Sequence, residues 1–567
     1  AISKPFWHTA IPNAWPDTHS TAMIVIIVSS ALGLVSLVLG IVAMFPPALD
    51  LLPAAGVQPH GGLKRQAQIH ADRPTDAKPN IVLLLTDDQD LQFNSTQAMP
   101  FTSRFIGSEG AVFENFFAHT PVCCPSRAQL LSGRYMHNLK ATSASVHTCM
   151  RADVAGRPRF HQEAFAAGLQ QAGYTTLMAG KFLNGKAVSN CPTPGNSTVV
   201  PPPAGWDRYF VMCPDTCYVN CLFGDDGVAK WFNDSSYPEG SNYAPSLIGN
   251  VTLEFIRREL SSASPRPFFA YIAPHSPHSP ATPAPWYANA FSDKRAPRTA
   301  SYNVSVDDHH WMVSHQQYIS FKNEQALDEM SRNRLRTLLS VDDIMKGVVA
   351  LLEAKNALQN TVFVYTSDHG YHMGQFCLGA NKRQPYDTDV RIPMMLRGPG
   401  FKPGQRVKAL TGMPDLAPTL LELAGAGVPR GAVMDGRSFL PVLQTQQVAG
   451  TAARSVLAPG WREEYPIEYI ATQEEVEYDG FGHINDNGNN TFRGLRIVNG
   501  THDWAYFEFS DPYRDWDFDA PYFYELYDVG KDPAQLHNLY NLVSDAVREQ
   551  LHAKVNSWYG CAGARCG

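Results

Sequence analysis

The sequence predicts an α/β fold, a sandwich around a large, mostly parallel central sheet, with a smaller C-terminal α+β domain that carries a short antiparallel sheet. Two observations support this. Between residues 80 and 366, short continuous apolar runs alternate with longer segments of helical periodicity, the pattern of a parallel sheet covered on both faces. After about residue 450, short aromatic strand candidates are separated by loops.

The elements of the predicted catalytic domain, residues 79–450, follow each other in strand and helix order. Strands are expected at residues 80–86, 175–179, 267–272 and 361–366. Helices are expected near residues 99–109, from residue 125, near 161–172 and 246–260, and as one or two helices over 324–354. In the smaller domain, residues 451–567, the strand candidates are 492–498, 503–509 and 522–527.

The composition is that of a folded globular chain, not of a disordered, collagen-like or coiled-coil one. Of 567 residues, 44% are hydrophobic and 17% are charged. The formal net charge of −7 argues against nucleic acid as a partner, because a protein that binds nucleic acid through a broad basic face needs an excess of positive charge. Any anion that the protein binds must therefore meet a local cluster of positive charge.

The N-terminal segment is expected to attach the protein to a membrane. After a tail, residues 1–20, the segment 21–45 has no charged residue, and at roughly 1.5 Å per residue a helix of this length spans a hydrocarbon core of about 30 Å. We predict a transmembrane signal anchor, with a cleaved signal peptide and a buried core helix as alternatives. Residues 46–78, rich in Pro, Gly, Ala and Gln, are expected to form a linker.

Sequons and cysteines indicate the secretory pathway. The chain has ten cysteines, and disulfides are expected because Cys213, Cys217 and Cys221 do not have the spacing of paired zinc ligands. We expect a lumenal or extracellular catalytic domain, with lysosome, Golgi and cell exterior all open as final compartments. Glycosylation sequons begin at Asn94, Asn196, Asn233, Asn250, Asn303, Asn489 and Asn499.

Metal-ligating side chains follow two of the predicted strands. Asp87 and Asp88 come directly after the first strand, and Asp368 and His369 follow the strand at 361–366. The carboxyl ends of parallel strands meet at one edge of the sheet, the usual ligand site of such folds. Either pair alone could be a turn or a helix cap. Both together predict an oxygen-rich site for calcium or magnesium.

A helix start with two cysteines is the third element of the predicted site. Residues 123–134 read Cys-Cys-Pro-Ser-Arg-Ala-Gln-Leu-Leu-Ser-Gly-Arg, and proline in the first turn predicts a helix whose positive end faces the site. Arg127 and Arg134 lie four and eleven residues after Cys123, which does not fit the phosphate loop of a cysteine phosphatase. A disulfide at Cys123 or Cys124 is the structural alternative.

The pattern Cys123-x-Pro125-Ser126-Arg127, with the following Leu131-Ser132-Gly133-Arg134, resembles the signature of type I, formylglycine-dependent sulfatases. The resemblance covers nearly all of residues 79–545. Within the family it is greatest to N-acetylglucosamine-6-sulfatases, with fungal and algal arylsulfatases close behind. The other matching stretches are residues 86–90, 179–184, 274–277, 338–343, 367–372, 381–384, 525–528, 532–533 and 538–539.

The resemblance implies an alkaline-phosphatase-like sandwich and a sulfuric ester hydrolase. It implies that a formylglycine-generating enzyme oxidises Cys123 to formylglycine during maturation. Arg127 would stabilise the formylglycine hydrate, and Lys181, His275 and Lys382 would contact the sulfate or the leaving oxygen. The implied ligands of one Ca²⁺ ion are Asp87, Asp88, Asp368, His369 and an oxygen of the modified Cys123.

Two positions depart from the pattern of many sulfatases. His369 stands where asparagine is frequent and is a softer ligand, and Leu183 stands where many members have a histidine, so that Asn184 or another histidine would take that role. The charge balance fits an anionic substrate, because a sulfate ester is shielded by its own negative oxygens. Three aspartates are opposed by three basic side chains and the two charges of Ca²⁺, which leaves a net charge of +2.

The predicted function is therefore hydrolysis of the sulfate ester of a sugar or glycan, with N-acetylglucosamine 6-sulfate as the first choice. The alternatives are an arylsulfatase acting on aryl or alkyl sulfates, a phosphoric or phosphonic ester hydrolase of the same superfamily, and a membrane-tethered carbohydrate-binding protein without catalysis. Other candidates are expected to be structural: Trp206, Trp231 and Trp286 in the core, His309 and His310 at the surface or behind the site, and Asp342 and Asp343 in a packing network.

Overall fold

Most of the chain after residue 77 is described by the computed structural model. The predicted tail 1–20 and anchor 21–45, and all of the linker 46–78 but its last residue, lie outside the described residues. Among the helices that are described, none combines the length and the apolar character needed to cross a bilayer. The described residues are 78–566, except for 140–157, 185–188, 196–198, 214–216, 234–241, 444–459, 472–476, 479–481 and 511–517.

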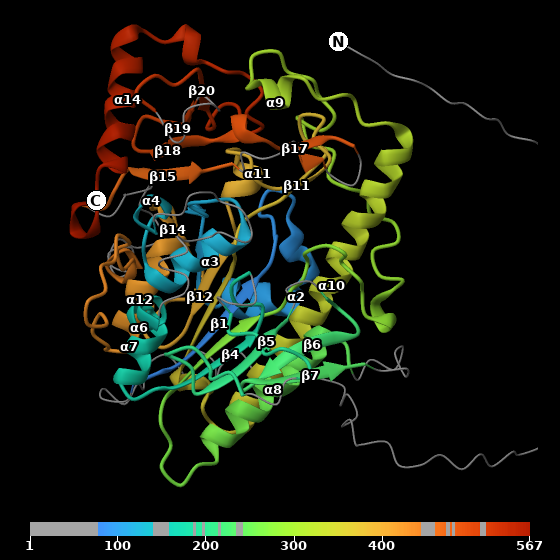
Figure 1. Cartoon of the computed structure of the whole chain (residues 1–567), viewed down its shortest axis with the longest axis vertical. Coiled ribbons are helices and arrows are strands. Elements are labelled where there is room, and N and C mark those ends of the chain that lie inside the picture. The colour runs from blue at the N-terminus through green and yellow to red at the C-terminus, as the bar shows by residue number, and fades with distance from the viewer. Residues whose placement is uncertain are drawn as a thin grey trace, which may run out of the picture. The chain divides into compact units, whose positions relative to one another are not determined.

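The main sheet has ten strands in the order β13-β2-β12-β9-β1-β8-β4-β5-β6-β7, and its centre is parallel (Figure 1). The parallel strands are β9 (Thr361–Ser367), β1 (Asn80–Thr86), β8 (Phe268–Ala273), β4 (Thr175–Gly180) and β5 (Arg208–Met212). On one side of this centre, β12 (Met394–Arg397) and β2 (Ala111–Phe113) continue the sheet by antiparallel pairing, and β13 (Gln405–Val407) then pairs parallel with β2. On the other side, β6 (Cys221–Asp225) and β7 (Val228–Phe232) pair antiparallel. The predicted, mostly parallel central sheet is confirmed.

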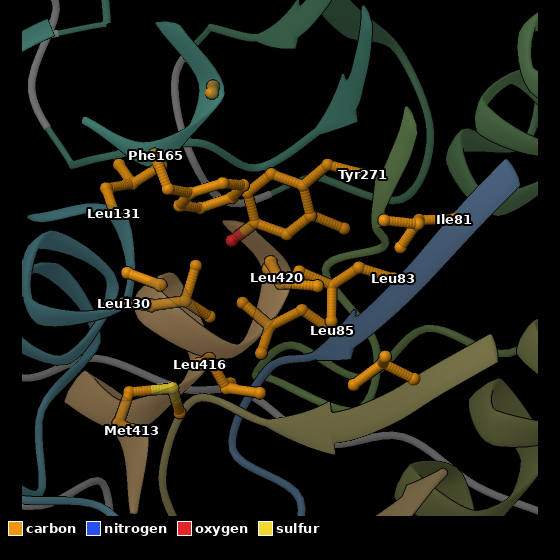
Figure 2. Packing of buried hydrophobic residues seen from close by; sticks show 14 of the residues in the cluster. Ile81, Leu83, Leu85, Leu130, Leu131, Phe165, Tyr271, Met413, Leu416 and Leu420 are labelled. Atoms are coloured by element: carbon orange, nitrogen blue, oxygen red, sulfur yellow. The ribbon is translucent and has the colours of Figure 1, made fainter. Parts of the chain in front are cut away.

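Strand β1 lies in the middle of the sheet and is buried on both faces, as its continuous apolar sequence predicts. Its odd-numbered residues Ile81, Leu83 and Leu85 belong to one hydrophobic cluster, and Val82 and Leu84 belong to another on the opposite face. Figure 2 shows the first cluster, in which the β1 side chains pack with Leu130 and other apolar residues of the helices on that face.

The helices form two layers around this sheet (Figure 1). The first cluster takes its helical residues from α3 (Cys123–Ser132), α7 (Phe165–Gln171) and α12 (Leu416–Leu423), and the second from α8 (Ala244–Leu260) and α10 (Phe321–Ala354). The segment predicted as a helix or two over 324–354 is one helix, α10. Its Asp342 accepts hydrogen bonds from the backbone N–H of Phe101 and Thr102 at 3.0 and 2.7 Å, which confirms a structural role for this aspartate.

Two predicted helices are interrupted. The helix expected near 99–109 is α2 (Pro100–Thr102) followed by one π-helical turn, Ser103–Ser108, and the helix expected near 161–172 is α6 (Pro158–Glu163) followed by α7. The other short helices are α4 (Met136–Leu139), α9 (Trp311–Ser314) and α11 (Asp387–Val390). Two-stranded pairs are formed by β3 (Phe116–Phe117) with β14 (Thr411–Gly412), β10 (His372–Met373) with β11 (Ala380–Asn381), and β16 (Glu477–Tyr478) with β17 (Ile484–Asp486).

The predicted C-terminal antiparallel sheet is confirmed, and it packs on the main body. Its order is β15 (Glu464–Tyr469), β18 (Phe492–Val498), β19 (Asp503–Phe509) and β20 (Phe523–Asp528). One face shares a buried cluster with Phe117 and Val122, and the other packs on α14 (Asp545–Tyr559). His309 and His310 are buried against this sheet, not exposed. The boundary at residue 450 falls outside the described residues and stays a prediction.

The cysteines bear out the expected disulfides. Bonds join Cys191 to Cys213, Cys217 to Cys221 and Cys561 to Cys566, and Cys124 is disulfide-bonded as well. Among the described residues, Cys123 and Cys377 are free and buried. The two adjacent cysteines of the helix start therefore differ: Cys124 serves as a cross-link and Cys123 is in no disulfide.

Candidate active site

The ends of neighbouring parallel strands bring the predicted site residues together. Because β1 and β9 pair in register, with Thr86 opposite Ser367, Asp87 and Asp88 emerge beside Asp368. The backbone N–H of Asp368 donates to the Thr86 carbonyl at 3.1 Å, and the N–H of Asp88 donates to Asp368 Oδ1 at 3.0 Å. Strand β4 ends directly before Lys181, and β8 ends two residues before His275.

Cys123 lies at the first turn of α3 and faces these strand ends. Its Sγ is 3.2 Å from His369 Nε2, 3.5 Å from Asp87 Oδ1 and 3.9 Å from Asp88 Oδ1, and none of the side chain is exposed. The backbone of Val122 is extended and α3 begins at Cys123 itself, so the turn from loop to helix directs this side chain into the acidic cluster.

Arg127 lies one helical turn after Cys123 and joins three parts of the site. Its Nε is 2.9 Å from Asp368 Oδ2, one guanidinium nitrogen donates to the Lys181 carbonyl at 2.7 Å, and the other lies 3.5 Å from Asp87 Oδ1. All of these groups are buried. A buried arginine held by two aspartates orders the positions of the acids and keeps positive charge beside Cys123.

Two lysines neutralise the first pair of aspartates. Lys181 Nζ is 2.7 Å from Asp87 Oδ2, and Lys382 Nζ is 2.8 and 2.9 Å from the two oxygens of Asp88. Burial would raise the pKa of Asp87, but Lys181 and Arg127 outweigh it and hold that pKa well below its usual range. Burial would likewise lower the pKa of Lys382, but Asp88 raises it, so this lysine is charged.

The orientation of His369 suits a metal ligand. Its Nδ1 lies 2.9 Å from the Gly370 carbonyl, which can only accept, so this nitrogen carries the proton. The other nitrogen, Nε2, points at Cys123 and lies 3.2 Å from Asp88 Oδ1. Ligand atoms of Asp87, Cys123, Asp368 and His369 all lie within 4.8 Å of one another, close enough to hold one ion.

His278 is a site residue that the sequence analysis missed. The rings of His275 and His278 are 4.5 Å apart, but their hydrogen bonds differ. Both nitrogens of His275 are engaged, by Asp87 Oδ2 at 3.0 Å and by the Ser279 carbonyl at 3.1 Å. The Nδ1 of His278 donates to the Ser279 carbonyl at 2.7 Å, and its Nε2 lies 3.8 Å from Asp88 Oδ2.

His278 also marks the side from which the cluster meets solvent. Its side chain is 17% exposed and that of Lys382 is 8% exposed, whereas those of Asp87, Lys181 and His369 are fully buried. Burial and the neighbouring positive charge of Lys382 hold the pKa of His278 well below its usual value, against the pull of Asp88. This imidazole is therefore neutral. A second histidine three residues after the first was the only signal in the sequence.

Other candidates do not reach the site. Leu183, at the position where a histidine was sought, belongs to the hydrophobic core, and the neighbouring Asn184 donates its N–H to Cys124 Sγ at 3.3 Å. His372, a further candidate because it lies three residues after His369, pairs with Asp389 at 2.9 Å. Trp206 is in the core as expected, but Trp231 and Trp286 are 54% and 50% exposed, so the expectation that they are core residues is wrong.

A family model described as Sulfatase matches residues 79–426. The chain belongs to the sulfatase family. It is 31% identical to the N-acetylglucosamine-6-sulfatase of Capra hircus over 505 residues, which are 86% of this chain and 85% of the goat protein. It is 30% identical to an arylsulfatase of Volvox carteri over 86% of this chain and 76% of the algal protein. The sulfatase is thus a sulfuric ester hydrolase.

Solved structures confirm the sulfatase fold. A protein solved in complex with its substrate, D-glucosamine-2-N,6-O-disulfate, has a TM-score of 0.65 and 22% identity, and the match covers 84% of this chain and 97% of that one. A phosphonate monoester hydrolase from Silicibacter pomeroyi has a TM-score of 0.59 and 20% identity over 84% of this chain and 94% of its own. At these identities the likeness concerns the fold alone.

Proposed function

We propose that this sulfatase removes the 6-sulfate of N-acetylglucosamine in a glycan, with a formylglycine at position 123 and one Ca²⁺ ion. One observation carries the proposal: Cys123 lies at the centre of the charged cluster and is in no disulfide, although its neighbour Cys124 is disulfide-bonded. Cys377 is also free and buried, so it is the position of Cys123 among aspartates, a histidine and basic side chains that distinguishes it. The formylglycine-generating enzyme is then a partner during maturation in the secretory pathway.

The donor set fits calcium. Asp87, Asp88 and Asp368 supply hard carboxylate oxygens, which Ca²⁺ prefers, and His369 directs Nε2 to the same cluster. Calcium, when bound, would supply two positive charges toward the sulfate oxygens and the oxygen of residue 123.

The basic side chains prepare the site for an anion. Without an ion, Arg127, Lys181 and Lys382 balance the three aspartates, and the two charges of Ca²⁺ then make the site positive. We assign to the two lysines the sulfate oxygens and to Arg127 the oxygen of residue 123. Since these groups are already held by Asp87, Asp88 and Asp368, they need little reorganisation as charge develops on the sulfate. A formylglycine hydrate would supply the hydroxyl that attacks sulfur.

The departing sugar oxygen needs a proton, and we assign its transfer to His278. This imidazole is neutral in the free site and its Nδ1 proton is held by the Ser279 carbonyl, so Nε2 must take up a proton from solvent when the anionic sulfate ester binds and then donate it to the sugar oxygen. His278 Nε2 is the histidine nitrogen on the exposed side of the cluster, whereas His275 uses both nitrogens to hold Asp87 and the Ser279 carbonyl. We therefore revise the role predicted for His275, which becomes the positioning of Asp87. Proton transfer by a histidine contributes roughly 10²- to 10⁴-fold to a rate.

The substrate assignment rests on similarity. The name of the goat relative and the substrate in the solved complex both contain a 6-sulfated glucosamine. The Volvox relative is an arylsulfatase, so aryl or alkyl sulfates are the second candidate. Initial rates of sulfate release from a panel of mono-sulfated sugars decide between them. Preference for the 6-sulfate of N-acetylglucosamine supports the proposal, and equal or higher rates on simple aryl sulfates contradict it.

The nucleophile is tested by Cys123→Ala. We expect the variant to fold, because the change removes one buried sulfur and leaves Arg127 paired with Asp368, and to release no sulfate from any ester. The mass of the peptide that contains residue 123 in active wild-type protein should show an aldehyde in place of the thiol. Turnover by Cys123→Ala, or an unmodified thiol in fully active protein, would refute the assignment. Phosphate release from matched aryl esters is measured in parallel to exclude a phosphoric ester hydrolase.

A further inference from the structure

Lys382 is held in place on its N-terminal side by the segment that carries the proposed metal ligands. It follows β11, which pairs antiparallel with β10, and His372 of β10 lies three residues after His369. On the other side, the N–H of Gln384 donates to Asp389 Oδ2 at 2.9 Å. Between these two fixed points stands Arg383.

Arg383 has a backbone conformation that is unusual for a residue with a side chain. Its φ is 90°, in the left-handed region that glycine adopts without strain. Such a conformation is strained and persists only where surrounding contacts hold it. Because φ of Arg383 sets the direction of the chain that leaves Lys382, a change there would move the Lys382 backbone.

The contacts that hold Arg383 come from the C-terminal part of the chain. Asn490 Nδ2 donates to the Arg383 carbonyl at 2.9 Å and to Asp486 Oδ1 at 3.1 Å. Arg383 pairs with Asp486 Oδ2 at 3.3 Å, and the hydroxyl of Tyr469 donates to the same oxygen at 2.6 Å. Asp486 and Asn490 have no exposed surface. A buried network on β15, β17 and the following turn thus fixes the residue next to Lys382.

We propose that Asp486 and Asn490 are positioning residues, which hold Arg383 in its left-handed conformation and so place Lys382 Nζ against Asp88. The proposal rests on the role assigned to Lys382 above. It makes the C-terminal part of the chain a component of the catalytic apparatus, although neither Asp486 nor Asn490 contacts Asp87, Asp88 or Cys123 through any hydrogen bond among the described residues.

A double-mutant cycle tests this coupling. We expect Asp486→Asn to lower kcat/KM about 10- to 100-fold, the effect of a small misplacement of a catalytic group. In the Lys382→Ala background the same change should have little further effect, because there is no lysine left to position. Losses that multiply in Asp486→Asn/Lys382→Ala would overturn the proposal, since they would show that Asp486 acts independently of Lys382.

Glu508→Gln is the matched control. Glu508 is a fully buried carboxylate on β19 of the C-terminal four-stranded sheet and accepts from Arg493, Tyr506 and His552. We expect Glu508→Gln to lower the melting temperature, as Asp486→Asn does, but to leave kcat/KM unchanged. If Lys382→Ala is impaired but Asp486→Asn behaves like Glu508→Gln, the positioning role is wrong and the role of Lys382 stands. If Lys382→Ala itself retains full activity, both fail.

Asn490→Ala provides a second route if Asp486→Asn does not fold. It removes the donor to the Arg383 carbonyl, and we expect a similar loss of kcat/KM. Adding Arg383→Gly should recover part of that loss, because glycine reaches a φ of 90° without strain, whereas adding Arg383→Ala should not. Equal activity of the two double variants would contradict the backbone argument.

Discussion

The two histidines at the site show how much a single hydrogen bond decides at the residue scale. His275 and His278 lie three residues apart with rings 4.5 Å apart. Asp87 occupies His275 Nδ1, while the nearest carboxylate oxygen to His278 Nε2 is 3.8 Å away. This difference is why we assign the positioning of Asp87 to His275 and the proton transfer to His278.

Replacing His278 should harm substrates with poor leaving groups most. We expect His278→Gln to lower kcat on a sugar 6-sulfate by roughly 10²- to 10⁴-fold, because an alcohol must be protonated as it leaves. An aryl sulfate with an acidic phenol needs little protonation and should lose far less. His275→Gln, the control, should reduce both rates alike, because it disturbs Asp87. Equal losses on both substrates in His278→Gln would contradict the assignment.

The site residues that could be predicted are those whose place follows from the order of strands along the chain. Asp87, Asp88, Asp368 and His369 follow buried parallel strands, so their meeting at one sheet edge could be predicted. The choice between His275 and His278 could not, because it depends on the turn around Ser279, whose carbonyl both histidines approach. The strained Arg383 likewise depends on residues about a hundred positions later in the chain.

At the scale of elements, a buried charged bridge joins the segment around α4 to strand β15. Glu468 Oε1 of β15 lies 2.5 Å from His119 Nε2 and 3.0 Å from His137 Nδ1, and His119 Nδ1 lies 2.7 Å from the Pro466 carbonyl. A tetrahedral ion holds its ligand atoms at about 2 Å from itself, which places any two of them more than about 3 Å apart. The separation of 2.5 Å therefore indicates a hydrogen-bonded bridge, not a metal site.

This bridge should make stability depend on pH. Burial would raise the pKa of Glu468, but His137 and His119 lower it. The stability that the ionised Glu468 contributes is therefore lost as pH falls below the ordinary pKa of 4.5. Burial would lower the pKa of His137, but Glu468 raises it above 6.5, so its contribution is full below 6.5 and is lost as pH rises through the folded value. The loss of unfolding free energy in Glu468→Gln should therefore be largest between about pH 4.5 and 6.5 and should shrink toward pH 8.

Chemical denaturation across that pH range measures this dependence. Glu163→Gln is the control, because Glu163 pairs with Arg134 and Arg159, which keep their charge throughout. If Glu468→Gln lowers the free energy of unfolding equally at pH 5.5 and pH 8, the charges of His119 and His137 do not contribute to the bridge.

Elements were predictable where an apolar run is long and uninterrupted. β1, β4, β8 and β9 lie in the centre of the sheet, are covered on both faces, and need apolar residues throughout. The outer strands escaped prediction because they have no such constraint: β2 has three residues, and the edge strand β7 is largely exposed and contains Lys230. Asp342, which is distant in sequence, accepts from the N–H groups of the first turn of α2 and so fixes where that helix starts.

At the scale of the whole molecule, the proposed calcium site joins the ends of β1 and β9 to the start of α3, so the ion should stabilise the fold. An ion bound only by the folded state at a hundred times its Kd adds about 2.7 kcal/mol to the free energy of unfolding. We expect chelation to lower both the melting temperature and activity, and added Ca²⁺ to restore both. Asp368→Ala should lose the calcium-dependent gain in melting temperature. A wild-type melting temperature indifferent to chelator and to Ca²⁺ would exclude a structural ion.

The complete burial of Cys123 has a consequence for the order of events in biosynthesis. No second enzyme can reach a side chain without exposed surface once α3 has packed on the strand ends. Any oxidation at this position has to occur while the nascent polypeptide is still open, in competition with its own collapse. A variant that folds faster through this region would therefore accumulate as stable, correctly shaped and inert protein, a defect that a thermal melt would not detect.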